Sequence, residues 1–343
     1  MKQKLLIIAP YQFGELTDCY YWAKYATIEG WDVTYLGYKY KQREVKVKSV
    51  MHYSNRMMLG IIFYLKCILE ILLHNHCNVI ICRMPMCQIL PKLFSKRNII
   101  LDVRTLSVSK DAMDREQQDN ALKGVKQLFN KCSVISEGVG QKIGTPYELL
   151  PLGAESLSSK PKSFDKMRLF YIGTFDNRNL SVFIEGLAMY QKQKNSDVGF
   201  DIVGGGSVEE TTAIKTTIEQ SEVKNVRLHG YLTHDEAQKF FDECNVGVCF
   251  VPVTDYYQYQ PPTKLYEYLL SGMVAISTNT ISNEEVMNEN NGVVVKDNAK
   301  AVCDGLKQLS LRLAEYNSVE IVSQSQKYHW AEIVKQNLLT LVK

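Results

Sequence analysis

Short apolar runs alternate along the whole chain with longer segments in which apolar residues recur every three or four positions. Uninterrupted apolar runs are typical of strands buried on both faces of a parallel sheet, and the longer period is typical of helices. Helices are predicted over residues 20–29 and about 56–74. Strands are predicted at residues 5–9, 32–37, 78–82, 98–103 and 131–136, and then at 168–172, 199–203, 226–229, 246–251, 274–278 and 292–295.

The alternation is interrupted once, over residues 152–164, where Gly153, several serines and Pro161 occur together. Such composition is typical of a linker between domains, and 343 residues suit two domains of ordinary size. The pattern predicts an α/β protein of two Rossmann-like domains, at 1–152 and 165–320, that face a central cleft. Ligands of such sheets bind at the carboxyl ends of the strands.

The charge of the chain is small but unevenly distributed. The net charge is only +3, which argues against a nucleic-acid partner, yet residues 1–100 carry 14 Lys and Arg against 6 Asp and Glu. A basic first half predicts an anionic ligand or surface on that side.

The nine cysteines are an odd, scattered set without a C-x-x-C pair. They indicate a reducing, cytoplasmic location rather than a disulfide framework or a zinc site.

No stretch reaches the roughly 20 apolar residues of a membrane span. The apolar run at the start ends at Pro10 and is interpreted as a first strand, not as a signal peptide. Residues 56–69 are unusually apolar for a helix, and a basic run precedes them: Lys39, Lys41, Arg43, Lys46 and Lys48. Two interpretations stay open: docking on the inner face of an anionic membrane, or a buried core helix beside a solvated basic loop.

The segment from Pro261 to Gly272 carries the most specific chemistry. Two prolines fix the backbone before a helix, with Thr263 as a candidate cap, and a helix start suits an anion. Lys264 and Glu267 are three residues apart, so they share one helix face. They would suit a pyrophosphate and a ribose hydroxyl, or they form an ordinary surface ion pair.

This Pro-x-Lys-Leu-x-Glu-Tyr-x-x-x-Gly pattern resembles the donor-site segment of GT-B glycosyltransferases, especially glycosyltransferase family 4 (glycosyl transferases group 1). The resemblance implies that Glu267 holds the ribose of a nucleotide-sugar donor and that Lys264 lies near its phosphates. It also implies that the last segment, residues 321–343, crosses back to the first domain, around Tyr328-His329-Trp330.

Two glycine loops fit the same family order. Residues 170–179 resemble the strand and loop that open the donor domain, which implies Gly173 and a diphosphate-binding Arg178; the alternative is a loop arginine in solvent. Residues 200–207 resemble the second strand with its glycine turn, which implies close approach of the donor at Gly205. A plain turn would explain the same residues.

The first half carries the acceptor-side candidates. Residues 99–104 resemble a strand beside the acceptor cleft, with Asp102 at its end and Arg104 after it. Asp102 is the candidate general base of an inverting enzyme; in a retaining enzyme it would only orient the acceptor. The alternative is a structural carboxylate paired with Arg104. Gly14, after the first strand, is a candidate for close approach to a ligand or a simple loop glycine.

Two features bear on the mechanism. The family commonly has a second glutamate eight positions before the first, and this chain has Tyr259 there, among tyrosines that would stack on a ligand or pack the loop. No Asp-x-Asp occurs, so we expect no metal and no cofactor other than the donor itself. Positive side chains and a helix start would then meet the charge of the leaving diphosphate.

These observations predict a metal-independent hexosyltransferase that moves a sugar from a nucleoside-diphosphate sugar to a carbohydrate or lipid-linked acceptor, in surface polysaccharide or glycolipid synthesis. Two alternatives stay open. One is a sugar-nucleotide epimerase of the same architecture, which would need acid and base groups around the donor sugar. The other is a non-catalytic nucleotide-sugar-binding subunit, which the altered Tyr259 position would suit.

Overall fold

The computed structural model describes residues 2–38, 46–50, 56–82, 86–109, 111–194 and 196–343. The chain divides into two compact units. The first contains Met1–Gly153 together with Trp330–Lys343, and the second contains Ala154–His329. The C-terminal residues of the chain therefore belong to the first unit.

The first unit is built on a parallel sheet of seven strands in the order β3-β2-β1-β4-β5-β6-β7. All five strands predicted for this half are present, with ends shifted by a few residues, and two further strands, β3 and β7, were not predicted. The strands are β1 (Lys4–Gln12), β2 (Asp32–Tyr38), β3 (Lys46–Val50), β4 (Asn78–Cys82), β5 (Asn98–Val103), β6 (Lys131–Val134) and β7 (Glu148–Leu149).

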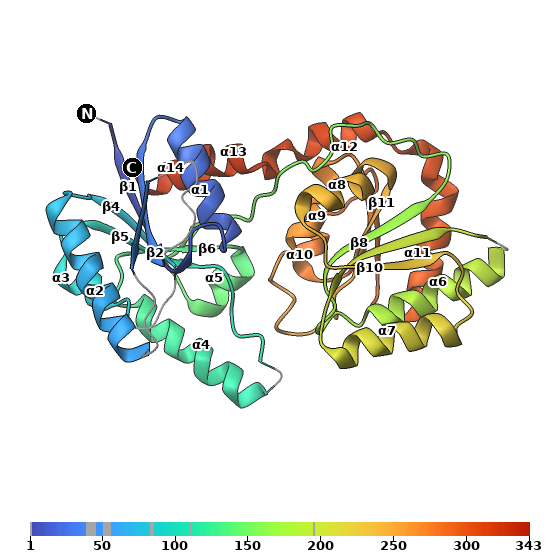
Figure 1. The fold of residues 1–343 in the computed structure, drawn as a ribbon, viewed down its shortest axis with the longest axis horizontal. Coiled ribbons are helices and arrows are strands. Elements are labelled where there is room, and N and C mark those ends of the chain that lie inside the picture. Colours follow the sequence, from blue (N-terminus) through green and yellow to red (C-terminus); the bar gives the residue numbers. More distant parts are fainter. Residues whose placement is uncertain (1, 39–45, 51–55, 83–85, 110, 195) are drawn as a thin grey trace. The chain divides into compact units, whose positions relative to one another are not determined.

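Helices cover both faces of this sheet (Figure 1). Helix α1 contacts β2 and the C-terminal helices, while α2, α3 and α4 lie on the other side. The helices are α1 (Thr17–Ile28), α2 (Arg56–Leu73), α3 (Ile89–Leu93), α4 (Ala112–Lys126), α5 (Glu137–Ile143), α13 (Trp330–Ile333), a π-helix at Val334–Leu338 and α14 (Leu339–Leu341).

The aromatic ring of Trp330 fixes the C-terminal segment to the first unit. Trp330 is fully buried and stacks on Tyr21 of α1, with ring centroids 5.6 Å apart. A side chain at Gly153 would lie 2.6 Å from the same ring, so glycine is needed where the chain leaves this unit. The two places where the chain passes between the units, Gly153–Ala154 and His329–Trp330, therefore lie next to each other.

The second unit has a six-stranded parallel sheet in the order β10-β9-β8-β11-β12-β13. This is the 3-2-1-4-5-6 order of the doubly wound fold, and all six predicted strands are present. The strands are β8 (Arg168–Thr174), β9 (Gly199–Gly205), β10 (Val226–Gly230), β11 (Val246–Cys249), β12 (Val274–Thr278) and β13 (Gly292–Val295).

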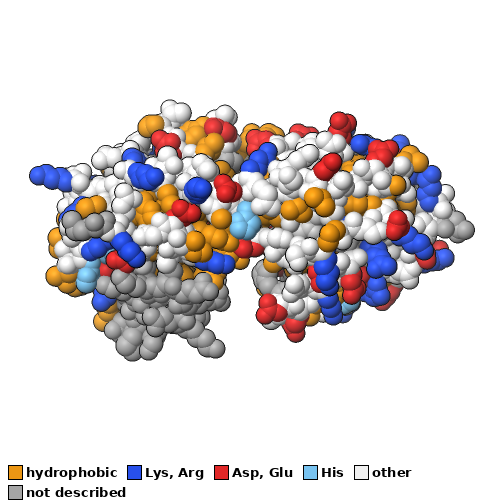
Figure 2. Space-filling model, turned by 90° about the horizontal axis from the view of Figure 1, so that it is seen from above, with side chains coloured by type: hydrophobic (Ala, Val, Ile, Leu, Met, Phe, Trp, Pro, Cys, Tyr) orange, Lys and Arg blue, Asp and Glu red, His pale blue; other side chains and the backbone are white. Residues whose placement is uncertain are grey.

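Its helices again form two layers: α6, α7 and α11 on one face, and α8, α9 and α12 on the other (Figure 1). Figure 2 shows Lys, Arg, Asp and Glu side chains interspersed on one face of this unit. The helices are α6 (Leu180–Lys194), α7 (Val208–Gln220), α8 (His234–Glu243), α9 (Thr263–Leu270), α10 (Ile281–Glu284), α11 (Ala299–Arg312) and α12 (Ser318–Ser325); short 3₁₀ turns occupy Leu313–Glu315 and Gln326–Tyr328.

The topological switch point of the second unit lies between β8 and β11. The two strands pair only at their starts, through Leu169 and Phe170 with Val246 and Gly247. Beyond that point the buried hydroxyl of Tyr268 fills the gap: it accepts from the Ile172 N–H at 3.2 Å and donates to the Val248 carbonyl at 3.4 Å. The strands thus diverge toward their carboxyl ends, where ligands of such sheets bind.

Candidate functional site

Two sequence-predicted residues, Gly173 and Lys264, meet at the carboxyl end of β8. The ammonium nitrogen of Lys264 lies over the ring of Tyr171, 3.7 Å from its centroid. A Cβ on Gly173 would lie 2.8 Å from the same nitrogen. Gly173 has a φ of +139°, a conformation that favours glycine. The glycine therefore leaves the space that the lysine ammonium occupies.

The Lys264 nitrogen has no solvent-accessible surface and, among the described residues, no hydrogen-bond partner. Burial lowers the pKa of Lys264 to about 7, and the nearby positive charge of Arg178 acts in the same direction. A buried ammonium without an acceptor is costly. The position suits an anionic ligand that would supply the missing acceptors.

Glu267 lies one turn further along α9. Burial raises the pKa of Glu267 to about 7, and Lys264 opposes that shift. Because each residue acts on the pKa of the other, the sequence-predicted pair forms one electrostatic unit. Both side chains belong to the helix that starts beside the switch point.

The start of α9 is not capped as the sequence suggested. The N-cap position is Pro262, which makes no side-chain hydrogen bond, and Thr263 is the first helical residue. The prediction of Thr263 as a cap is therefore wrong, because proline ends the extended segment one residue earlier. Without a capping side chain, the first N–H groups of α9 stay available to an anion.

Arg178 lies on the loop after β8 and is not a free solvent arginine. One of its terminal nitrogens donates to the hydroxyl of Tyr257 at 2.7 Å, and its guanidinium lies 4.9 Å from the centroid of the same ring. Tyr257 belongs to the tyrosine-rich segment that precedes α9. The sequence indicated that these tyrosines stack or pack, but it did not pair Tyr257 with Arg178.

The two glycines at the end of β9 have different surroundings. In the register of β8 and β9, Gly173 pairs with Gly204 and Thr174 with Gly205. A Cβ on Gly204 would lie 1.8 Å from the Gly173 carbonyl oxygen, whereas one on Gly205 would meet only Tyr231 at 3.7 Å. The close approach of the two strands is therefore made by Gly204.

The first unit brings Asp102 and Arg104 together, but in its interior. The Asp102 side chain is fully buried at the end of β5. One oxygen accepts from the Ser133 hydroxyl at 2.7 Å and lies 3.9 Å from Arg104. Burial raises the pKa of Asp102 to about 6, against the opposing effects of Arg104 and Ser133.

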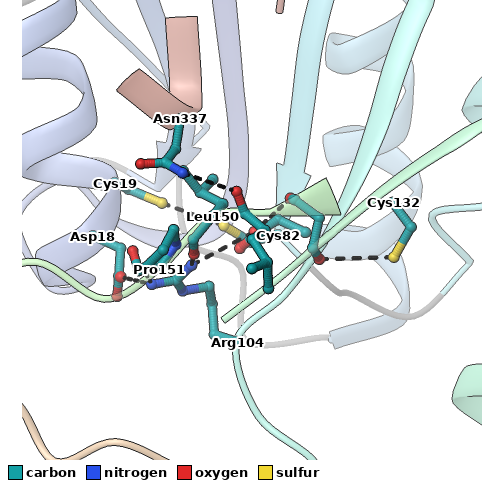
Figure 3. Close-up of polar contacts among 11 residues, drawn as sticks. Asp18, Cys19, Cys82, Arg104, Cys132, Leu150, Pro151 and Asn337 are labelled. Atoms are coloured by element: carbon teal, nitrogen blue, oxygen red, sulfur yellow. Dashed lines mark hydrogen bonds and ion pairs between the residues drawn. The ribbon is translucent and has the colours of Figure 1, made fainter. Parts of the chain in front are cut away.

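Arg104 is held on several sides. It forms an ion pair with Asp18 of α1 and donates to the Leu150 carbonyl at 2.5 Å (Figure 3). Its guanidinium also lies over the ring of Trp22. These contacts correct the view of Asp102 as a base at an open cleft: a carboxylate without exposed surface, paired with Arg104, fits the structural alternative.

Gly14 lies in the turn after β1 and has a φ of +92°. That conformation favours glycine whether or not a ligand is present, so the simple loop explanation accounts for the residue.

The second unit also has a cavity of about 850 Å³, but it is lined by residues at the beginnings of the strands, including Arg168, Gly199 and Asn225. It lies at the opposite edge of the sheet from Gly173, so it is not the candidate site.

A sequence comparison now gives this geometry a family context. Residues 166–311 match the family described as Glycosyl transferases group 1. The match lies within the second unit and covers less than half of the chain. The match contains Gly173, Arg178, Lys264 and Glu267, so the candidate site lies inside the matched segment. No curated protein sequence matches the chain.

Solved structures extend the likeness to the whole chain. A glycosyltransferase from Rickettsia africae has 14% identity and a TM-score of 0.76, with 99% of this chain and 98% of that chain covered. HepE from Anabaena, in complex with UDP and glucose, has 10% identity and a TM-score of 0.75, with 99% of both chains covered. Sucrose-phosphate synthase from Thermosynechococcus elongatus has 14% identity and a TM-score of 0.72, with 98% and 97% covered.

At these identities the likeness concerns the fold, and it confirms the GT-B architecture of two Rossmann-like units. None of the helices in the described part of the chain is long and apolar enough to cross a membrane.

Proposed function

We propose that this glycosyltransferase binds the diphosphate of a nucleoside-diphosphate sugar at the start of α9 and transfers a hexosyl group from it. The observation that carries the proposal is the enclosed Lys264 ammonium, which lacks an acceptor among the described residues and lies beside Gly173 at the switch point. A diphosphate oxygen is the kind of acceptor that this position lacks.

Each residue of the site has a proposed role. Lys264 and the N–H groups at the start of α9 bind the diphosphate, and Arg178 binds it from the loop after β8. Glu267 accepts hydrogen bonds from the ribose hydroxyls. As the glycosidic bond breaks, negative charge grows on the leaving diphosphate, and the two cations stabilise it.

We further propose that these cations make a divalent metal unnecessary and that no cofactor besides the donor takes part. Uridine is the first base to test, because HepE from Anabaena is described in complexes with UDP and with UDP-glucose. The proposed acceptor is a hydroxyl of a carbohydrate or lipid-linked saccharide, in surface polysaccharide or glycolipid synthesis on the inner face of a membrane.

The experiment is a release assay with purified protein. UDP-hexoses are incubated with and without a mixture of short saccharide acceptors, with and without EDTA, and free UDP and glycosylated product are measured. The proposal expects acceptor-dependent product with EDTA present. An isomerised donor without acceptor would indicate the epimerase, and tight UDP binding without turnover of any donor would indicate the binding subunit.

A further inference from the structure

Helix α2 of the first unit is apolar on the side that faces away from the sheet. Its inner face is formed by Phe63, Cys67 and Ile71, all buried, and by Glu70. Six large apolar side chains on the same helix are 50–74% exposed: Met58, Ile61, Leu65, Leu69, Leu72 and Leu73.

Five of these residues form one continuous stripe. The steps from Met58 through Ile61, Leu65 and Leu69 to Leu72 are three or four residues, the spacing of one helix face. Helix α4, in the same layer, shows the usual pattern, since its exposed positions include Glu, Gln and Lys. The outer face of α2 therefore lacks the polar side chains of an ordinary surface helix.

The exposed charged side chains on α2 and on or just after α3 have one sign. Lys66 is exposed on α2 itself, and Lys92 and Lys96 are exposed on and just after α3. Helix α3 lies on the same side of the sheet as α2 (Figure 1), and Tyr64 of α2 interacts electrostatically with Cys87, just before α3.

Neither α2 nor α3 carries an exposed acidic side chain. Within 56–82 and 86–97 the only acidic residue is Glu70, which is buried and lies 3.0 Å from His76. An apolar stripe on a helix whose exposed charge is a lysine, without an exposed acidic side chain, is complementary to a bilayer surface with anionic headgroups.

We infer that α2, with Lys66, Lys92 and Lys96, docks this glycosyltransferase on an anionic lipid bilayer. The inference rests on the proposed function, in which the acceptor lies at the inner face of a membrane. It names the surface that would bring the enzyme to that membrane. The chain offers no helix able to span a bilayer in its described part, so the docking is interfacial.

A second copy of the chain is the rival occupant of the stripe. Pairing two α2 helices would bury the same leucines, but it would also bring two sets of lysines toward each other. Like charges at close range disfavour such a contact, whereas anionic headgroups attract both the lysines and the helix.

The test is flotation of the full chain with two kinds of vesicle. One kind contains phosphatidylcholine alone, and the other also contains about 30 mol% of the anionic lipid phosphatidylglycerol. The wild-type chain should float with the anionic vesicles and should be released as salt is raised. The triple variant Ile61→Gln, Leu65→Gln, Leu69→Gln keeps good helix formers at exposed positions. It should lose more than about tenfold in vesicle affinity, because each buried leucine contributes strongly to insertion.

The matched control is Val208→Gln, Leu311→Gln, Val319→Gln, three exposed apolar positions of the second unit. It should bind vesicles as the wild type does. The charge variant Lys66→Gln, Lys92→Gln, Lys96→Gln should lose the preference for anionic vesicles. UDP binding and transfer to a soluble saccharide should be unchanged in all three variants, which separates failure of this inference from failure of the proposed function.

Three outcomes would overturn the inference. The wild type does not float with anionic vesicles, or the α2 variant floats as well as the wild type does. The third is that light scattering shows the wild type to be a dimer and the α2 variant to be a monomer.

Discussion

The ammonium group of Lys264 occupies the space beside Gly173 that any other residue there would fill, 2.8 Å from the position of a Cβ. The two residues are far apart in the sequence, and the switch point between β8 and β11 brings them together. The lysine is thereby enclosed at the place where doubly wound sheets bind their ligands. The proposed donor site follows from this relationship.

Protonation of Lys264 should accompany UDP binding. Burial lowers the pKa of Lys264 to about 7 in the free protein, and a bound diphosphate would raise it again. Between pH 8 and pH 9.5 the UDP phosphates and Glu267 are already ionised, so binding should take up one proton. The dissociation constant should rise by about tenfold per pH unit in this range. Calorimetry of UDP binding in buffers of different ionisation enthalpy measures the uptake, and a zero uptake contradicts the role of Lys264.

The two neighbouring glycines of the β9 turn should differ sharply in their tolerance of alanine. Gly204→Ala places a Cβ 1.8 Å from a backbone oxygen at a φ of +137° and should cost about 3 kcal/mol or more of unfolding free energy. Gly205→Ala meets only a tyrosine ring at 3.7 Å and should stay within about 0.5 kcal/mol of the wild type. Urea denaturation of both variants compares them directly; equal losses would show that the strand register is different.

Tyr257 should act as a positioning residue for Arg178. Tyr257→Phe keeps the ring under the guanidinium but removes the hydroxyl that accepts its hydrogen bond. We expect UDP affinity to fall by about threefold to tenfold, the effect of losing about 1 kcal/mol, as for a typical hydrogen bond, with thermal stability little changed. Tyr256→Phe, the adjacent tyrosine, is the matched control. If both variants bind UDP as the wild type does, Tyr257 does not position Arg178.

Asp102→Asn separates the structural carboxylate from the general base. As a buried structural group, Asp102 should be replaceable with kcat within about threefold, whereas loss of a general base costs about 100-fold or more. The folded-state pKa is raised to about 6 from 3.8, so the protonated form contributes stability that is present below pH 3.8 and is lost as the pH rises through 6.

The wild type should therefore lose about 2–3 kcal/mol from this group between pH 4 and pH 7, a loss that Asp102→Asn should lack. Denaturation curves at both pH values test the stability, and steady-state rates test the chemistry. A large fall in kcat with unchanged stability would restore Asp102 as the base.

The sequence reached part of this site and not the rest for identifiable reasons. Lys264 and Glu267 could be paired because helical spacing alone puts them on one face. The choice between Gly204 and Gly205 could not be made, since it depends on the register of two strands that the chain does not specify locally. The surroundings of Asp102 depend on Ser133 of β6 and, through the neighbouring Arg104, on Asp18 of α1, two segments far from Asp102 in the sequence.

Helix α2 shows a similar limit. Its residues are apolar on both faces, so the sequence pattern could not tell a core helix from a surface helix. The structure shows one buried and one exposed face. Lys39, Lys41 and Arg43 of the basic run lie outside the described residues, and Lys46 and Lys48 fall in the edge strand β3.

The most direct measurement of the central claim is calorimetric titration of UDP into the wild type and Lys264→Met, with thermal unfolding of both proteins. Methionine fills similar space without a buried ammonium, so the variant without ligand should be as stable as the wild type or more so, by about 1 kcal/mol. The account predicts that this intact variant loses UDP binding by at least about 100-fold, a value typical of losing a buried charged contact. A folded Lys264→Met protein that binds UDP with wild-type affinity would contradict it.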